Sequence, residues 1–173
     1  MNEHNNTGAG SADAASSAFL IAPEGRQKVG ESLRLLLADF FTLYLKTKNF
    51  HWHMTGPHFR EYHLLLDEQA TELFDATDAI AERARKIGEI TLRSIGDVSR
   101  YQRLSDSKTT DAPASTMLQC LRDDNVSLAK SMRQAHEVCD AAGDLATASL
   151  LENWIDEAER RSWFLSATIN SAD

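Results

Sequence analysis

The feature of this sequence that most constrains its fold is the regular spacing of apolar residues, which recur at steps of mostly three and four positions in four segments. In the first segment the repeat comprises Val29, Leu33, Leu36, Phe40, Tyr44 and Phe50. This spacing places apolar side chains on one face of an α-helix, and that face has to be buried against other helices. The pattern therefore predicts four long amphipathic helices, which run after Pro23 to near Trp52, from Pro57 to Gly88, from Met117 to Gly143 and from Leu145 to Ile169.

The connections between these segments decide the topology. Short turns at residues 54–57 and 141–144 join the helices into two hairpins, whereas residues 88–115 form a long link in which Ile95 to Leu104 can form one short helix. We therefore predict an all-α fold, a ferritin-like four-helix bundle with a long crossover that contains a short helix. Residues 1–22, rich in Ala, Ser, Asn and Gly, are predicted to form a flexible tail before a single domain of residues 23–173.

Composition argues against several classes of partner. Acidic residues outnumber basic ones by 26 to 18, and the resulting net charge of -8 repels nucleic acid and anionic membranes but suits a protein that handles cations. No apolar run approaches the roughly 20 residues that a membrane span needs, and the N-terminus lacks the pattern of a signal peptide. Cys120 and Cys139 lie on one predicted helix, roughly 28 Å apart at about 1.5 Å per residue, so they cannot bridge each other. We expect a cytoplasmic protein with reduced cysteines.

Four of the six histidines lie between Phe50 and Asp67, and the second predicted helix carries two pairs of metal-ligand residues. His63 and Asp67 form one pair, and Asp78 and Glu82 form the other. Each pair has the spacing i, i+4, which places both of its side chains on one helix face. Imidazole with carboxylate gives a mixed N/O environment that iron accepts, and zinc, copper or manganese can also enter such a site on ligand type alone. The pairs therefore predict a divalent-metal site.

The two pairs are too far apart to close one site within a chain. Asp67 and Asp78 are separated by roughly 16 Å along one helix at about 1.5 Å per residue, and both pairs lie on the flank of the apolar stripe. The sequence also contains no Glu-x-x-His motif, which a conventional di-iron bundle uses in its core. The remaining arrangement is a two-fold interface, at which antiparallel helices bring one pair to the other pair of a second subunit, with His51 as a further ligand.

At these residues the chain resembles the Dps family of mini-ferritins, the DNA-binding proteins from starved cells. The matching signature consists of Asn49, Phe50, His51, Trp52, His53, Gly56, Phe59, His63, Asp67, Asp78, Glu82 and Arg83. The resemblance implies a hollow dodecamer that oxidises Fe(II), preferably with hydrogen peroxide, and stores ferric mineral inside, which protects against oxidative damage. The ferroxidase sites would be shared across dimer interfaces. Their ligands fall on His51, His63 and Asp67 of one subunit and on Asp78 and Glu82 of its neighbour.

The resemblance also implies further roles. Acidic residues at spacing i, i+4 usually form a solvated helix face. Asp78 and Glu82 are therefore assigned as metal ligands only because the other residues of the family signature accompany them. Trp52 matches a position close to the family's site, where it could quench radicals, with interface packing as the alternative. The family's acidic pores at the three-fold axes map to Asp144 as a metal-binding residue, and less closely to Asp140. Acidic residues at a helix N-terminus are equally well explained as caps.

The family's DNA binding is expected to be weak or absent here. The first basic residue is Arg26, so the N-terminal tail offers little counterion release on binding phosphates. One alternative function is a nucleoid-associated, DNA-compacting protein with iron chemistry secondary, and another is a cage in which zinc has a purely structural role. His53 and His58 are assigned to turn or interface roles, with a secondary metal site as the alternative.

Overall fold

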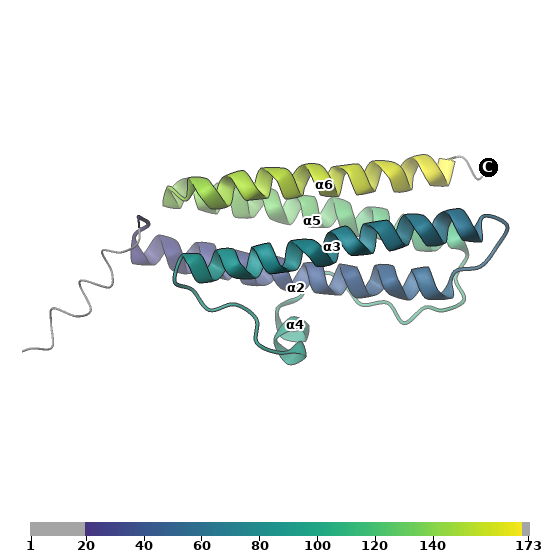
Figure 1. Ribbon diagram of the computed structural model, residues 1–173, viewed down its shortest axis with the longest axis horizontal. Helices are drawn as coiled ribbons and strands as arrows, with labels where there is room; N and C mark the ends of the chain where they lie inside the picture. Colours follow the sequence, from purple (N-terminus) through teal and green to yellow (C-terminus); the bar gives the residue numbers. More distant parts are fainter. Residues whose placement is uncertain (1–19, 171–173) are drawn as a thin grey trace, which may run out of the picture.

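The computed structural model describes residues 20–170, so nearly all of the predicted N-terminal tail lies outside the described residues. Its elements are α2 (Pro23–His53), α3 (Phe59–Lys86), α4 (Ile95–Tyr101), α5 (Ala114–Ala142) and α6 (Leu145–Asn170). In Figure 1 the hairpin of α2 and α3 packs against the hairpin of α5 and α6, and the crossover carries α4 alongside α2. The prediction of an all-α four-helix bundle with a short helix in its crossover is confirmed, and residues 20–170 contain no strand.

The helix ends follow from local chemistry. α2 begins at Pro23, whose missing N–H is not needed in the first turn. α5 ends where Gly143 adopts a left-handed conformation with φ of 71°, which residues with a Cβ rarely adopt. α6 begins directly afterwards with Asp144 as its cap, because a carboxylate oxygen accepts the backbone N–H of Thr147 at 3.1 Å. This tight turn sets α5 and α6 antiparallel.

The apolar repeat forms one core between the four long helices. Its fully buried members include Val29, Leu36 and Phe40 of α2, Leu66, Leu73 and Ile80 of α3, Leu121, Leu128 and Met132 of α5, and Leu151, Ala158 and Leu165 of α6. Burying one large aliphatic or aromatic side chain contributes about 1.5–3 kcal/mol of transfer free energy. The sum over these positions is the main favourable term that opposes the loss of chain entropy on folding.

Polar side chains of α2 hold the crossover. The carboxylate of Asp39 is 1% exposed and accepts the backbone N–H groups of Arg103 and Leu104 at 2.6 and 3.1 Å. It also pairs with the Arg103 guanidinium at 2.6 Å. Further along α2, Asn49 Nδ2 donates to the carbonyl oxygen of Ser107 at 3.2 Å. Because the backbone N–H groups of Arg103 and Leu104 donate to Asp39, they do not continue the helix. α4 therefore ends at Tyr101 and not at the predicted Leu104.

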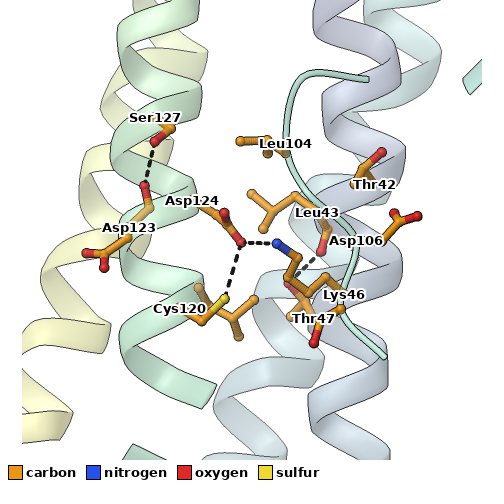
Figure 2. Close-up of polar contacts among 12 residues, drawn as sticks. Thr42, Leu43, Lys46, Thr47, Leu104, Asp106, Cys120, Asp123, Asp124 and Ser127 are labelled. Atoms are coloured by element: carbon orange, nitrogen blue, oxygen red, sulfur yellow. Dashed lines mark hydrogen bonds and ion pairs between the residues drawn. The ribbon is translucent and has the colours of Figure 1, made fainter. Parts of the chain in front are cut away.

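A buried ion pair joins the two hairpins. Figure 2 shows Lys46 of α2 extending toward Asp124 of α5, and Lys46 Nζ lies 2.7 Å from Asp124 Oδ2 with the lysine side chain only 3% exposed. The thiol of Cys120 donates to the same oxygen at 3.9 Å. Cys120 and Cys139 are both free thiols on α5, as predicted. Removing one charge would leave the other buried and unpaired, so the pair favours a single alignment of α2 against α5.

Candidate metal centre

The turn between α2 and α3 brings His51 and His63 face to face. Their rings stack with 3.7 Å between the centroids and an interplanar angle of 19°. His51 Nδ1 lies 2.7 Å from the carbonyl oxygen of His63, and His63 Nδ1 lies 2.9 Å from the carbonyl oxygen of His51. The end of one helix and the start of the next thus fix both imidazoles reciprocally.

These hydrogen bonds determine which ring nitrogen is available to a metal. A carbonyl oxygen can only accept, so each Nδ1 carries the proton and donates it. In the neutral imidazole Nε2 then keeps a free lone pair, and a second-sphere hydrogen bond of this kind is typical of metal-bound histidine. Because His51 is only 7% exposed, its packing restricts the orientation of its ring. The turn therefore presents two oriented Nε2 donors.

Asp67, one turn after His63, adds a carboxylate to these donors. Its Oδ1 lies 3.8 Å from His51 Nε2. Lys48 of α2 forms an ion pair with the same oxygen. By hydrogen bonding and by charge, this ammonium holds the pKa of Asp67 below its ordinary value. Asp67 is therefore ionised at neutral pH, and a metal that binds it has to displace Lys48.

The second pair, Asp78 and Glu82, lies roughly three turns further along α3 and is exposed. Glu82 Oε2 pairs with Lys86 at 2.9 Å, in an exposed i, i+4 contact of the kind that contributes little to stability. Within residues 20–170, no three or more His, Cys, Asp or Glu side chains are arranged so that they could hold a metal ion. His51, His63 and Asp67 thus lie near one another at the turn without forming a metal site by themselves, and Asp78 and Glu82 lie away from them.

Exposed aromatic residues accompany both groups. Phe74 lies on α3 between Asp67 and Asp78; it is 51% exposed, and its ring is 5.1 Å from that of Tyr44. Phe74 follows Asp67 by about two helical turns and so shares its face. Trp52, in the last turn of α2, is 59% exposed. A large exposed aromatic side chain such as Phe74, set between carboxylates on one helix face, is the kind of apolar surface that marks protein–protein contacts.

The predicted pore residues have other partners within the protomer. Asp144 is buried where it caps α6, and it accepts a 2.6 Å hydrogen bond from Arg83. Its carboxylate therefore serves the fold, and a role at a pore stays a prediction. Asp140 pairs with His136 Nδ1 at 3.2 Å, and Nε2 of this histidine lies 3.2 Å from Glu152. His136 is thus a link between α5 and α6.

Lys48 is the residue of this centre that the sequence analysis missed. It precedes His51 by three positions and lies on the same side of the helix, a spacing that could have drawn attention to it. The spacing does not show that its ammonium meets Asp67, because that contact depends on how α2 packs on α3. His53 and His58, by contrast, are exposed at the turn, and His53 Nδ1 donates to a carbonyl of its own helix at 2.8 Å.

Comparisons with known proteins identify the family. The family model for the ferritin-like domain matches residues 31–173. DNA protection during starvation protein 1 from Deinococcus radiodurans is 33% identical over 144 residues, which cover 83% of this chain and 70% of that protein. The chain belongs to the Dps family.

Solved Dps structures have the same fold. A Dps protein from Bacillus brevis matches with a TM-score of 0.82 at 29% identity, covering 86% of this chain and 99% of that one. The Dps protein from Vibrio cholerae matches with a TM-score of 0.81 at 27% identity, covering 86% and 93%, and is described as a member of a broad superfamily of ferritin-like diiron-carboxylate proteins. The ferritin-like character of the predicted fold is thereby confirmed. None of the helices between residues 20 and 170 combines the length and the apolar content that crossing a bilayer demands.

Proposed function

We propose that this chain is a Dps-type ferroxidase and iron store in which two subunits complete each site. The observation that carries the proposal is the separation of two ligand groups along one helix. Asp67 and Asp78 lie roughly 16 Å apart on α3 at about 1.5 Å per residue, with the exposed Phe74 between them. In a two-fold contact between antiparallel α3 helices, the first group of each subunit meets the second group of the other. Two identical sites then form per dimer.

In such a site Fe(II) is the substrate, and the protein acts on it by ligation and charge. The Nε2 atoms of His51 and His63 suit the ferrous ion, and the carboxylates favour the ferric product because hard oxygen donors prefer the higher charge. Each of two Fe(II) ions gives one electron to a hydrogen peroxide molecule. The O–O bond breaks, two protons are taken up, and two water molecules form. Because both electrons reach the same peroxide, no hydroxyl radical is released.

The surrounding residues prepare this chemistry. Lys48 balances the charge of Asp67 until iron displaces it, so the carboxylate needs no deprotonation at neutral pH. Trp52 is exposed next to His51 in the sequence and is available to intercept radicals or to pack at the interface. Assembly into a dodecamer and deposition of ferric oxyhydroxide inside it belong to the same proposal. We propose no DNA-binding role, because the net charge is -8 and no basic residue precedes Arg26.

Mixing two inactive variants tests whether the sites are shared. One variant carries His63→Ala and Asp67→Ala, and the other carries Asp78→Ala and Glu82→Ala. In a random mixture about half of the dimers are mixed, and by two-fold symmetry each of these holds one intact and one doubly broken site. Refolding the two chains together should therefore restore about a quarter of the wild-type sites, measured as peroxide-driven Fe(II) oxidation.

The controls separate sharing from other causes of recovery. Each variant refolded alone should stay inactive, and Glu68→Ala, which removes an exposed carboxylate from a different face of α3, should oxidise iron normally. Mass spectrometry of intact assemblies verifies that the chains have mixed. If Fe(II) oxidation does not recover in verified mixed assemblies, shared sites are refuted. If the metal is zinc with a purely structural role, wild-type protein should bind metal without accelerating Fe(II) oxidation.

A further inference from the structure

Phe59, the first residue of α3, packs against the imidazole of His63. Its ring centroid lies 4.9 Å from that of His63, with an interplanar angle of 35°. The same imidazole is stacked on His51, whose ring covers one of its faces at 3.7 Å. Phe59 therefore contacts a part of the His63 ring that His51 leaves free. Two aromatic rings thus pack on this one ligand.

The start of α3 brings Phe59 to this position. The backbone N–H of Phe59 donates to the Gly56 carbonyl at 3.1 Å, and α3 begins at Phe59 directly after this turn. Phe59 and His63 are then four residues apart, a spacing at which side chains are neighbours on a helix surface. Side chains of a helix point back toward its N-terminus, so His63 reaches over the turn that carries Phe59. The contact is therefore a consequence of local geometry.

The orientation of His63 depends on such contacts more than that of His51 does. His51 is 7% exposed, so the protein packs around its ring, whereas His63 is only half-buried. The hydrogen bond from His63 Nδ1 to the His51 carbonyl fixes one direction of the ring but allows it to tilt about that axis. The χ2 torsion of histidine resists such a tilt weakly, because its energy wells are broad. Rings packed on His63 oppose the tilt and so determine where its Nε2 points.

We propose that Phe59 is a positioning residue of the ferroxidase centre and that its ring holds the His63 imidazole with Nε2 presented to the metal. The inference rests on the proposed function and deepens it, because Phe59 acts on iron only through a ligand. A metal-bound imidazole gains positive charge, which the negative face of an aromatic ring attracts. An aliphatic side chain can fill the same space but offers no such face.

Replacing the ring by an aliphatic side chain tests the proposal. Phe59→Leu should lower the affinity of the assembled protein for Co(II) by about two- to tenfold, the range that corresponds to one aromatic pair. Phe59→Ile repeats the test with a different aliphatic shape, so the result does not depend on the folding of one variant. Phe59→Tyr keeps the ring and should bind Co(II) as wild type does. For Fe(II) oxidation, the loss in Phe59→Leu should appear in KM and leave kcat largely unchanged.

Leu64→Ala is the matched control. Leu64 directly follows His63 on α3, and its exposure of 45% is close to the 42% of Phe59. The control removes apolar surface but no ring, so its affinity for Co(II) should equal that of wild type. Thermal unfolding of the same variants should show Phe59→Leu close to wild type, because a positioning residue affects the ligand more than the fold. An equal loss of Co(II) affinity in Phe59→Tyr or Leu64→Ala would overturn the proposal, as would unchanged affinity in Phe59→Leu.

A crystal structure of metal-free Phe59→Leu separates this inference from the proposed function. The His63 ring should occupy more than one orientation or lose its hydrogen bond to the His51 carbonyl. A single His63 orientation identical to that of wild type would count against a positioning role. If wild-type protein binds Co(II) but does not accelerate Fe(II) oxidation, the proposed function fails, and the crystal and Co(II) comparisons still decide the role of Phe59.

Discussion

Replacing Asp39 by alanine tests whether one buried carboxylate holds the crossover. Asp39 is 1% exposed, and its oxygens accept the backbone N–H groups of Arg103 and Leu104 and pair with the Arg103 guanidinium. A buried N–H left without an acceptor costs about 1–3 kcal/mol, and losing one member of a buried ion pair costs about 3–5 kcal/mol. Arg103 is exposed and regains water, so the lower part of this range applies. We expect a loss of about 3 kcal/mol, which lowers Tm by roughly 6–12 °C for a chain of this size.

Urea unfolding at a fixed protomer concentration measures this loss, because the stability of an oligomer depends on concentration. Hydrogen exchange at the amides of Arg103 and Leu104 should accelerate in Asp39→Ala. Arg103→Ala is the matched control: it removes the guanidinium but keeps both backbone hydrogen bonds to Asp39. It should destabilise the protein because the buried carboxylate loses its cation, but amide exchange at Arg103 and Leu104 should stay slow. Accelerated exchange of both amides in Arg103→Ala, or unchanged amide exchange in Asp39→Ala, would refute the backbone clamp.

Three further perturbations have directions that the structure decides. Lys48→Met should raise the affinity of the assembled protein for Co(II), because no ammonium has to leave Asp67. In Lys48→Met the pKa of Asp67 should return toward its ordinary 3.8, so protons compete better with Co(II) and the loss of Co(II) binding on acidification should begin at a higher pH. Co(II) titrations at several pH values measure the affinity and this shift. Curves identical to those of wild type would contradict the ion pair between Lys48 and Asp67. Gly30→Ala should lower the thermal unfolding midpoint although alanine favours helices, because the new Cβ would lie 2.5 Å from Glu89 Cγ. A Gly30→Ala, Glu89→Gly double variant removes this clash and should be more stable than Gly30→Ala. If it is no more stable, the clash is not the cause. Cys139, whose pKa burial raises to about 12, should resist iodoacetamide at about pH 8 until urea unfolds the protein, as mass spectrometry can show; labelling of the folded protein at the unfolded rate contradicts this.

The sequence alone was sufficient to predict where the helices lie and which side chains share a helix face. The apolar spacing predicted four long helices close to their observed bounds, and Gly143 marked the turn between the last two. The same geometry showed that Asp67 and Asp78 cannot meet within one helix. These conclusions involve residues near one another in the chain, and for such residues the rise and periodicity of the α-helix determine distance and direction.

The tertiary structure alone decided which distant groups meet. Nothing in the local pattern showed that His51 and His63 exchange hydrogen bonds across the turn, that Lys48 reaches Asp67, or that Arg161 is a core residue. The attachment of the crossover to α2 was equally unpredictable. Each of these contacts depends on the rotation and offset of one packed helix against another, and side-chain packing across the whole core sets those values. Periodicity along a single segment carries no information about them.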